Sequence, residues 1–118
     1  MDYSTKYCLM CYQADELTEI FKTQPQPKIV MKRLNERTFM MSDKQRLGSD
    51  YVWLPTEEQL EKLTEAFSDT DYFTFIKQPY HPEETELPFN LFHSFEQYRL
   101  TFFMKKMYNK FWLNSQWV

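Results

Sequence analysis

The stretch Val52-Trp53-Leu54-Pro55-Thr56-Glu57-Glu58-Gln59-Leu60-Glu61-Lys62-Leu63 predicts a strand, a sharp boundary and a helix in immediate succession. Its first residues, together with Tyr51, form a short apolar run with β-branched and aromatic members, which is typical of a strand. Pro55 ends this run because proline has no backbone N–H and a fixed φ angle. Thr56 stands three residues before Gln59, which is the spacing of a helix capping box. The stretch organises the fold and carries no chemistry of its own.

The residues before this stretch predict a helix followed by a β-hairpin. Tyr7 to Phe21 places apolar side chains on one face at helical spacing, and the prolines of segment 23–27 end that helix. Two apolar segments, Lys28 to Lys32 and Thr38 to Met41, then flank a turn at Asn35-Glu36. A polar loop with the chain's only glycine leads from this predicted hairpin to the central strand.

The residues after the central stretch are less regular. The capped helix is expected to end near Ala66, and Ser68 to Asp71 has the composition of a turn. Weak alternation from Tyr72 to Ile76 predicts a fourth strand. A second capping box, Ser94 to Gln97, predicts the start of the longest helix. Its buried face is predicted to hold Leu100, Phe103, Met104, Met107 and Phe111.

Together these elements predict an α+β fold, because strands and helices do not alternate regularly enough for a parallel doubly wound sheet. We expect a small, mainly antiparallel sheet of three to five strands packed against two or three helices. The tail from Gln116 to Val118 is a candidate for pairing with a sheet edge. With 118 residues, no internal repeat and no long linker, the chain is expected to form a single domain over residues 1–118.

Charge is unevenly distributed along the chain. The formal net charge is −3, and it divides into +2 over residues 1–49, −8 over residues 50–93 and +3 over residues 94–118. The overall balance argues against direct nucleic-acid binding. The acidic middle is interpreted as a solvated helix face, with mimicry of nucleic acid as the alternative. Lys32-Arg33 and Arg37 could form a small basic patch, and a solvated strand face is the preferred interpretation.

The composition also restricts the cellular compartment and the kinds of binding site that we expect for this chain. No stretch reaches the roughly 18 apolar residues that cross a membrane, and the first residues lack a secretory apolar core. Two cysteines and seven methionines fit a reducing compartment, so a cytoplasmic location is expected. A single glycine in the whole chain excludes a glycine-rich phosphate loop or a dinucleotide fingerprint.

Cys8 and Cys11 form a Cys-x-x-Cys pair, the pattern of half a zinc site or of a redox pair. Zinc would need two further ligands, and the only histidines, His81 and His93, are far along the chain. A thioredoxin-like site follows a strand, and only seven residues precede this pair. We interpret the cysteines as small apolar side chains one helical turn apart. We expect no cofactor, no bound metal and no enzymatic activity.

Aromatic side chains in the proline-rich segment 79–93 are the candidate partner-binding residues. Aromatic residues make up 19% of the chain, and Tyr and Trp are enriched at interface hot spots. The segment either folds back over the core or stands out as a patch, and its prolines would lower the entropy cost of docking. The predicted contact residues are Tyr80, Phe89 and Phe92, with Trp117 near the end of the chain.

Several motifs, taken together, resemble a known group of proteins. They are Met10-Cys11, Val52-Trp53-Leu54-Pro55, Glu58-Gln59-Leu60, Phe95-Glu96-Gln97, Phe103-Met104-Lys105, Tyr108-Asn109-Lys110-Phe111-Trp112 and Gln116-Trp117-Val118. The chain is similar to a family of small uncharacterised phage and prophage proteins with a Trp-Leu-Pro-x-x-x-Gln-Leu centre and a Trp-Val C-terminus. Leu113-Asn114-Ser115 departs from the Asn-Gly or Asp-Gly turn that is typical of that family.

The resemblance implies an origin in a mobile element and no known activity. Small phage proteins often act by binding a host or phage protein, which is an argument by analogy. We therefore expect a phage- or prophage-encoded, non-enzymatic binding protein, a monomer or small homo-oligomer in the cytoplasm of a bacterial host cell. It would modulate a host or defence complex through protein–protein contacts. Two alternatives stay open: a small metal- or thiol-dependent enzyme using Cys8 and Cys11, and an acidic mimic of nucleic acid.

Overall fold

The computed structural model of the chain describes residues 1–24, 27–83 and 86–118. The predicted helix break at 23–27 and the proline-rich segment therefore fall partly outside the described residues. The chain divides into two compact units: unit 1 comprises Met1–Thr56 and Trp112–Trp117, and unit 2 comprises Glu57–Phe111 and Val118. The described residues form six helices, a three-stranded antiparallel sheet and a two-stranded one, which confirms the α+β class. The single domain expected over residues 1–118 stays a prediction.

Unit 1 begins with two short helices, α1 (Thr5–Gln13) and α2 (Asp15–Phe21). The Ser4 hydroxyl caps α1 by accepting a hydrogen bond from the Tyr7 N–H at 3.2 Å. One continuous helix was predicted here, and that prediction is wrong at Ala14, where φ is −87° and ψ is 83°. Alanine is the best helix former, but this residue is buried, so tertiary packing overrides its propensity.

The sheet of unit 1 has the strand order β2-β1-β3. Its strands are β1 (Ile29–Asn35), β2 (Thr38–Ser42) and β3 (Tyr51–Leu54). The central strand β1 pairs antiparallel with both neighbours, so that Met31 lies opposite Met41 in β2 and opposite Val52 in β3. The predicted hairpin and the predicted central strand are both confirmed. This topology makes β2 one edge of the sheet and β3 the other.

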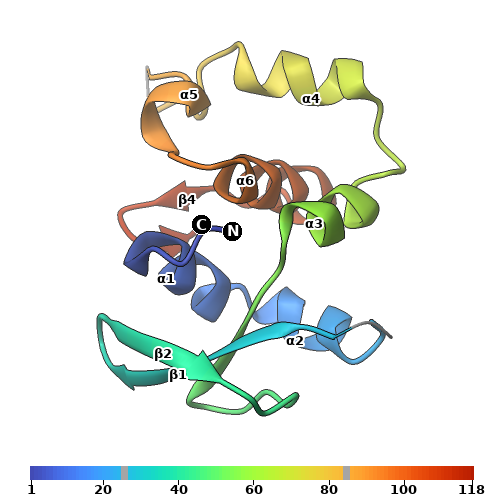
Figure 1. Cartoon of the computed structure of the whole chain (residues 1–118). Helices are drawn as coiled ribbons and strands as arrows, with labels where there is room; N and C mark the ends of the chain where they lie inside the picture. Colours follow the sequence, from blue (N-terminus) through green and yellow to red (C-terminus); the bar gives the residue numbers. More distant parts are fainter. Residues whose placement is uncertain (25–26, 84–85) are drawn as a thin grey trace. The chain divides into compact units, whose positions relative to one another are not determined.

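Helix α1 lies against one face of this sheet (Figure 1). The Tyr12 ring meets the Phe39 ring of β2 edge to face, with 6.4 Å between centroids. The Tyr7 hydroxyl donates a hydrogen bond of 2.6 Å to the Pro55 carbonyl, which ties α1 to the residue that ends β3. The proline boundary of the central stretch is thus also an anchor point for α1.

The end of the chain forms a second hairpin, β4 (Trp112–Leu113) and β5 (Gln116–Trp117). Its turn residues Asn114 and Ser115 adopt positive φ angles of 51° and 62°. The Trp117 indole N–H donates a hydrogen bond of 2.9 Å to the Met10 carbonyl of α1. The tail was predicted to pair with a sheet edge, and its strand partner is β4 rather than the main sheet.

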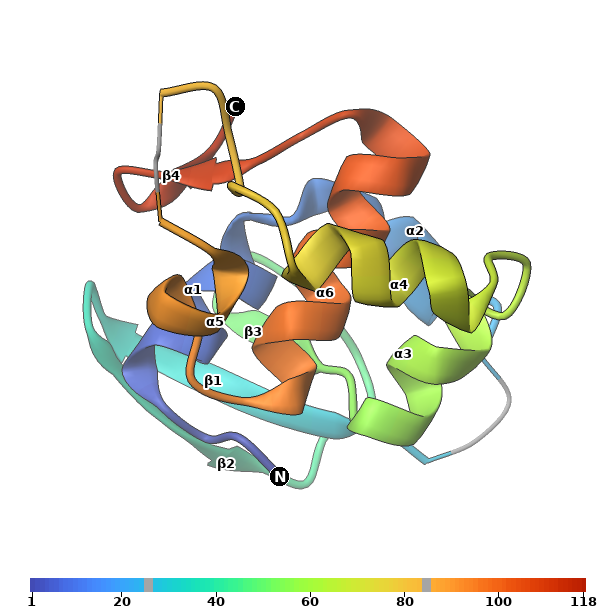
Figure 2. The ribbon, with the colours of Figure 1, turned by 90° about the horizontal axis from the view of Figure 1, so that it is seen from above.

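Unit 2 is helical, with α3 (Glu57–Leu63), α4 (Asp69–Ile76), α5 (Pro88–Leu91) and α6 (Phe95–Tyr108). Both α3 and α4 pack on α6 (Figure 2). The Ser94 hydroxyl caps α6 by accepting a 3.1 Å hydrogen bond from the Gln97 N–H, as predicted. The Gln97 side chain in turn accepts a hydrogen bond from the His93 N–H at 3.1 Å.

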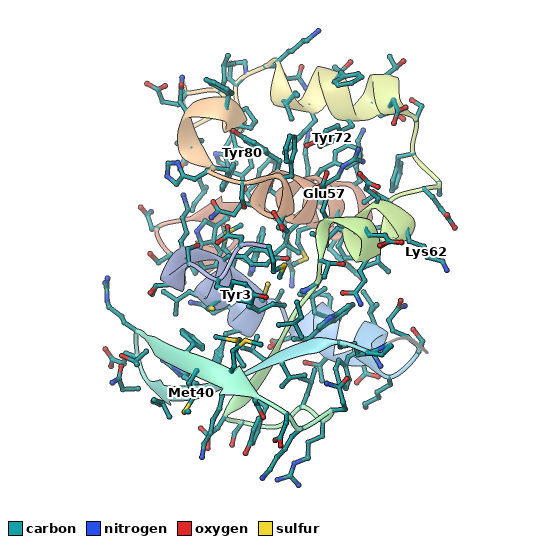
Figure 3. All side chains as sticks on the ribbon, viewed as in Figure 1. Tyr3, Met40, Glu57, Lys62, Tyr72 and Tyr80 are labelled. Carbon is teal, nitrogen blue, oxygen red and sulfur yellow. The ribbon has the colours of Figure 1, made fainter. Side chains whose placement is uncertain are left out.

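The strand predicted from Tyr72 to Ile76 is wrong, because this segment is the greater part of α4. The Ser68 hydroxyl accepts a hydrogen bond from the Asp71 N–H at 3.1 Å, and the Asp71 carboxylate accepts one from the Ser68 N–H at 3.3 Å. This capping box starts a helix where a turn was predicted. Tyr72 then lies between α4 and α6 (Figure 3), with its ring 5.3 Å from that of Phe102.

The buried face of α6 is broader than predicted. Leu100, Phe103 and Met104 are buried, and so is Phe102, which the predicted stripe omits. Met107 is exposed, so its place in the stripe is wrong. A helix with packing partners on more than one side buries more than one stripe of side chains.

Candidate functional site

Two of the four predicted partner-binding residues belong to the core of unit 2. Tyr80 and Phe92 are only 3% and 2% exposed, and their ring centroids are 5.1 Å apart. Tyr80 also meets the rings of Phe75 and Phe111 at 6.2 and 5.4 Å. The expectation that these two side chains are presented to a partner is therefore wrong. Both rings turn inward because burying a large aromatic side chain removes apolar area from water, which stabilises the fold.

The other two predicted residues remain accessible. Phe89 in α5 is 73% exposed, and its carbonyl accepts a 3.3 Å hydrogen bond from the Tyr98 hydroxyl. Trp117 is half-buried on β5 in unit 1, where its ring lies 5.2 Å from that of Trp112. Phe89 and Trp117 belong to different units, and their contact with a partner stays a prediction.

Cys8 and Cys11 are free, buried cysteines of α1. Burial raises the pKa of the Cys8 thiol to about 11 and holds the pKa of Cys11 well above its ordinary range. Since the thiolate is the form that attacks substrates and binds metals, both side chains stay in their unreactive form near neutral pH. Among the described residues no group of three or more His, Cys, Asp or Glu side chains could hold a metal ion.

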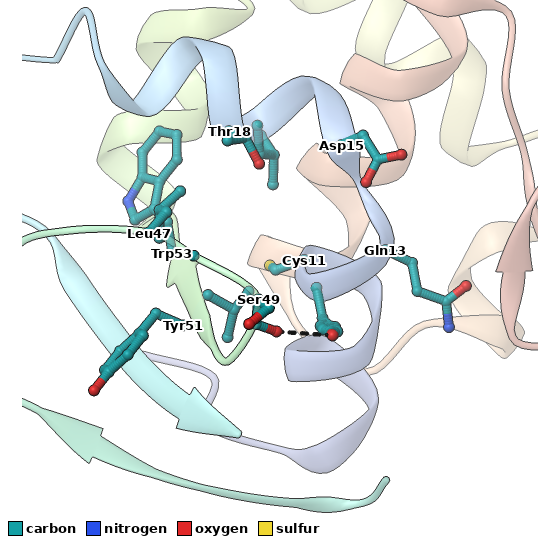
Figure 4. A pocket seen from close by; sticks show the side chains of 12 residues that line it. Cys11, Gln13, Asp15, Thr18, Leu47, Ser49, Tyr51 and Trp53 are labelled. Carbon is teal, nitrogen blue, oxygen red and sulfur yellow. Dashed lines mark hydrogen bonds between the residues drawn. The ribbon is translucent and has the colours of Figure 1, made fainter. Parts of the chain in front are cut away.

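A pocket of about 460 Å³ lies in unit 1, between the end of α1, the start of α2 and the loop before β3 (Figure 4). Tyr12 and Ser49 both line this pocket, and the Tyr12 hydroxyl donates a 2.9 Å hydrogen bond to the Ser49 carbonyl. Asp15 and Thr18 add polar side chains to its lining, and Trp53 adds an apolar wall. The Cys11 thiol, which also lines it, is held protonated, so the pocket offers hydrogen-bonding groups rather than an activated nucleophile.

A second hollow, of about 670 Å³, lies on the sheet of unit 1, over the β1–β2 hairpin and Tyr51 of β3. Its lining residues, which we call the hairpin surface, are Lys32, Met40, Met41, Ser42, Asp43, Lys44 and Tyr51. Met40 is 50% exposed and Met41 is 57% exposed. Met40 lies on the side of β2 that faces away from α1 (Figure 3). The hairpin surface thus exposes apolar side chains to water across the sheet, with Met40 and Met41 at its β2 edge.

Positive charge surrounds this apolar patch. A hydrogen bond with Lys44 lowers the pKa of the Tyr51 phenol, and a hydrogen bond with Arg46 and the charge of Lys32 act in the same direction. The Lys44 Nζ and the Arg46 Cζ each lie 5.5 Å from the centroid of the Tyr51 ring. Residues 28–46 contain six basic and two acidic residues, a net charge of +4. The hairpin surface is therefore both apolar and cationic.

Comparisons with protein-family models, curated proteins and solved structures found no match for this chain. Within the described ranges, no helix has both the length and the apolar character needed to span a bilayer. The class of protein is accordingly defined by fold and surface alone: a small α+β protein with a cationic, methionine-bearing hairpin.

Sequence reasoning overlooked Met40, Met41 and Tyr51 as candidate contact residues. A signal was present in the sequence, because Thr38–Ser42 contains no charged residue and no proline. Natural edge strands usually carry such residues to block pairing with other chains. The signal could not be used from sequence, since it has meaning only once β2 is known to be an edge.

Proposed function

We propose that this chain is a phage- or prophage-encoded, non-enzymatic binding protein in the cytoplasm of a bacterial host cell. It modulates a host or defence complex through protein–protein contacts. The binding role is supported by one observation above others: the edge strand β2 leaves Met40 and Met41 half exposed on its two faces, and Met40 shares a cation-lined hollow with Tyr51. The mobile-element origin is supported by the resemblance carried by the Trp-Leu-Pro centre and the Trp-Val end.

The side chains of the hairpin surface suit contact with another protein. Single exposed apolar residues are normal, but here an exposed methionine lies with a tyrosine in one hollow, and a second exposed methionine follows it on the other face of the same edge strand. Methionine is flexible and polarizable, which lets it adapt to a partner surface. Lys32 and Lys44 at the rim would steer an anionic partner and set its orientation.

The test is recovery of host proteins from a bacterial lysate with the tagged full chain, followed by quantitative mass spectrometry. Met40→Glu places a charge in the patch and should abolish capture of the specific partner. Met107→Glu is the matched control, since Met107 is also 50% exposed but lies on α6 in unit 2. Equal capture by both variants would show that the hairpin surface does not carry the binding. Melting temperatures confirm that both variants are folded.

Mimicry of nucleic acid is the second candidate, and the acidic surface of α3 and α4 favours it. Residues 57–71 hold six acidic residues and one basic residue, and most of the acidic side chains are exposed. If this surface carries the binding, partner affinity should fall steeply between low and high salt. Charge reversal at Glu58 and Glu61 should then abolish it. We expect a weak salt dependence and no effect of that reversal.

A metal- or thiol-dependent enzyme is the less supported alternative, because burial holds Cys8 and Cys11 protonated. Purified protein is expected to contain no stoichiometric zinc or iron by elemental analysis. A metal-to-protein ratio near one that is lost on changing both cysteines to serine would support this alternative instead.

A further inference from the structure

The outer edge of β2 has peptide groups that point away from the sheet. The Arg33 N–H donates a 2.6 Å hydrogen bond to the Asp50 carbonyl, on the β3 side of β1. In an antiparallel sheet both backbone groups of a residue point the same way, and alternate residues point to opposite sides. Lys32 therefore bonds toward β2, where Met40 lies opposite it.

The residues of β2 alternate in the same way. Since Met40 and Ser42 bond to β1, the N–H and C=O groups of Phe39 and Met41 point to the open edge. Among the described residues, no group outside the sheet forms a hydrogen bond with either peptide. At the opposite edge of the sheet, by contrast, the Tyr51 N–H donates to the Gly48 carbonyl at 3.3 Å.

This open edge lacks the usual protection against pairing. Natural edge strands carry a lysine, a proline or a bulge, or are covered by another segment. Thr38–Ser42 has neither charge nor proline, and the one irregularity in the β1–β2 pairing lies near the turn, between Arg33 and Asn35. Met40 and Met41 are half exposed on the two faces of this strand.

We propose that an extended acidic segment of a partner protein adds to this sheet as a fourth strand beside β2, pairing with the peptide groups of Phe39 and Met41. The inference rests on the proposed binding function and specifies its partner. Backbone hydrogen bonds along an edge supply affinity for any extended segment, and side chains on alternate faces supply specificity. The acidic character follows from the net charge of +4 over residues 28–46.

The two faces of the added strand would meet different surroundings. Phe39 and Met41 share the face of β2 that lies toward α1, so apolar side chains of the partner fit there. Met40, opposite Lys32, lies on the other face, where Lys44 adds a second ammonium group to the hollow. Carboxylates of the partner fit this second face. The expected partner segment therefore alternates apolar and acidic residues.

Two other occupants fit the observations less well. Nucleic acid bound to a sheet usually stacks its bases on exposed aromatic side chains, whereas the hairpin surface presents methionines, and its one tyrosine, Tyr51 of β3, lies against the cations of Lys44 and Arg46. If the β2 edges of two copies paired, the net charge of +4 over residues 28–46 of one copy would lie against the same charge of the other. Five acidic residues of each copy lie in α3 and α4, which are helices and cannot add as a strand.

The probe is a fluorescein-labelled twelve-residue peptide of alternating valine and glutamate, titrated against the full chain at low ionic strength by fluorescence polarisation. Met41→Pro removes the outward N–H without breaking a bond to β1, whereas Met41→Ala keeps that N–H. We expect Met41→Pro to weaken binding about tenfold or more and Met41→Ala to change it about threefold or less. Hydrogen exchange on the unaltered chain should show peptide-dependent protection of the Phe39 and Met41 amides, a readout that needs no variant.

The following results would overturn the proposal that an acidic strand adds beside β2. Equal binding by Met41→Pro and Met41→Ala, or unprotected Phe39 and Met41 amides, would exclude strand addition. If Met40→Glu still abolished capture from the lysate in that case, the proposed binding function would stand without strand addition. A valine–lysine peptide that binds as tightly would exclude recognition of acidic residues. Preference for an oligouridylate would point to nucleic acid, and protection of the same amides by self-association alone would point to a second copy.

Discussion

The helical layer of unit 2 and the hairpin of unit 1 place their large apolar side chains differently. In unit 2 the rings of Tyr72, Phe75 and Tyr80 are packed against their neighbours and excluded from water. In unit 1 the edge strand leaves Met40 and Met41 half exposed. These rings of unit 2 thus build a core, although Phe73, Phe89 and Phe95 are exposed, whereas the β1–β2 hairpin exposes methionines. A surplus of aromatic residues is consequently a poor guide to where a partner binds.

The largest expected effect tests whether the aromatic layer is the core of unit 2. Phe102 is fully buried, with the rings of Phe67, Tyr72 and Phe75 within 5.8 Å of its own. Phe102→Ala should lower the free energy of unfolding by about 3–5 kcal/mol, because it removes this contact and leaves a cavity. Phe89→Ala, at an exposed ring, should lower it by about 0.5 kcal/mol or less. Urea denaturation measures the free energy of unfolding of both variants. Equal losses would contradict the difference between a buried core ring and an exposed one.

The second prediction concerns the buried thiol of Cys8 in α1. Folding raises the pKa of this thiol from its ordinary 9.0 to about 11, so the unfolded chain gives up the proton more readily. Below about pH 9 the protonated thiol makes its full contribution to the free energy of unfolding. This contribution, on the order of 2 kcal/mol, is lost as the pH rises to about 11. The difference in unfolding free energy between the unaltered chain and Cys8→Ala should therefore shrink across that range. A difference independent of pH would refute a buried, protonated thiol.

The third prediction tests the local signal that starts α4. Ser68→Ala removes the acceptor for the Asp71 N–H and should lower stability by about 1 kcal/mol. Thr70→Ala, at an exposed position of the same helix, is the control and should change little. Similar losses of about 1 kcal/mol are expected for Thr56→Ala and Ser94→Ala, the two caps predicted from sequence. Urea midpoints that do not move for Ser68→Ala would mean that the helix starts elsewhere.

The smallest expected effect is on the hairpin itself. Met40→Ala should change the free energy of unfolding by about 0.5 kcal/mol or less, because the side chain is half exposed. Met104→Ala, the same substitution at a buried position of α6, should cost about 2–5 kcal/mol. Thermal and urea unfolding distinguish the two. A large loss for Met40→Ala would show that this methionine packs into the fold and would remove it from the binding surface.

Prediction from sequence succeeded where the signal is local. The strand before Pro55, the helix after it and the Ser94 cap each depend on a few neighbouring residues. It failed over Tyr72 to Ile76, because five residues are too few to separate a period of two from a helical period. The spacing of Ser68 and Asp71 held the better signal, a capping box that was interpreted as a turn.

The sequence by itself determined the α+β class, the first hairpin, the central strand and the longest helix. These follow from apolar periodicity, prolines and caps, whose physical effects extend over one or two turns of chain. Only the tertiary structure decided that Tyr80 and Phe92 are buried and that β2 is an open edge. Burial and strand order arise from contacts between distant segments, such as the ring of Tyr80 against that of Phe111. No local pattern encodes such contacts, because the apolar area that a side chain buries depends on which other segments reach it.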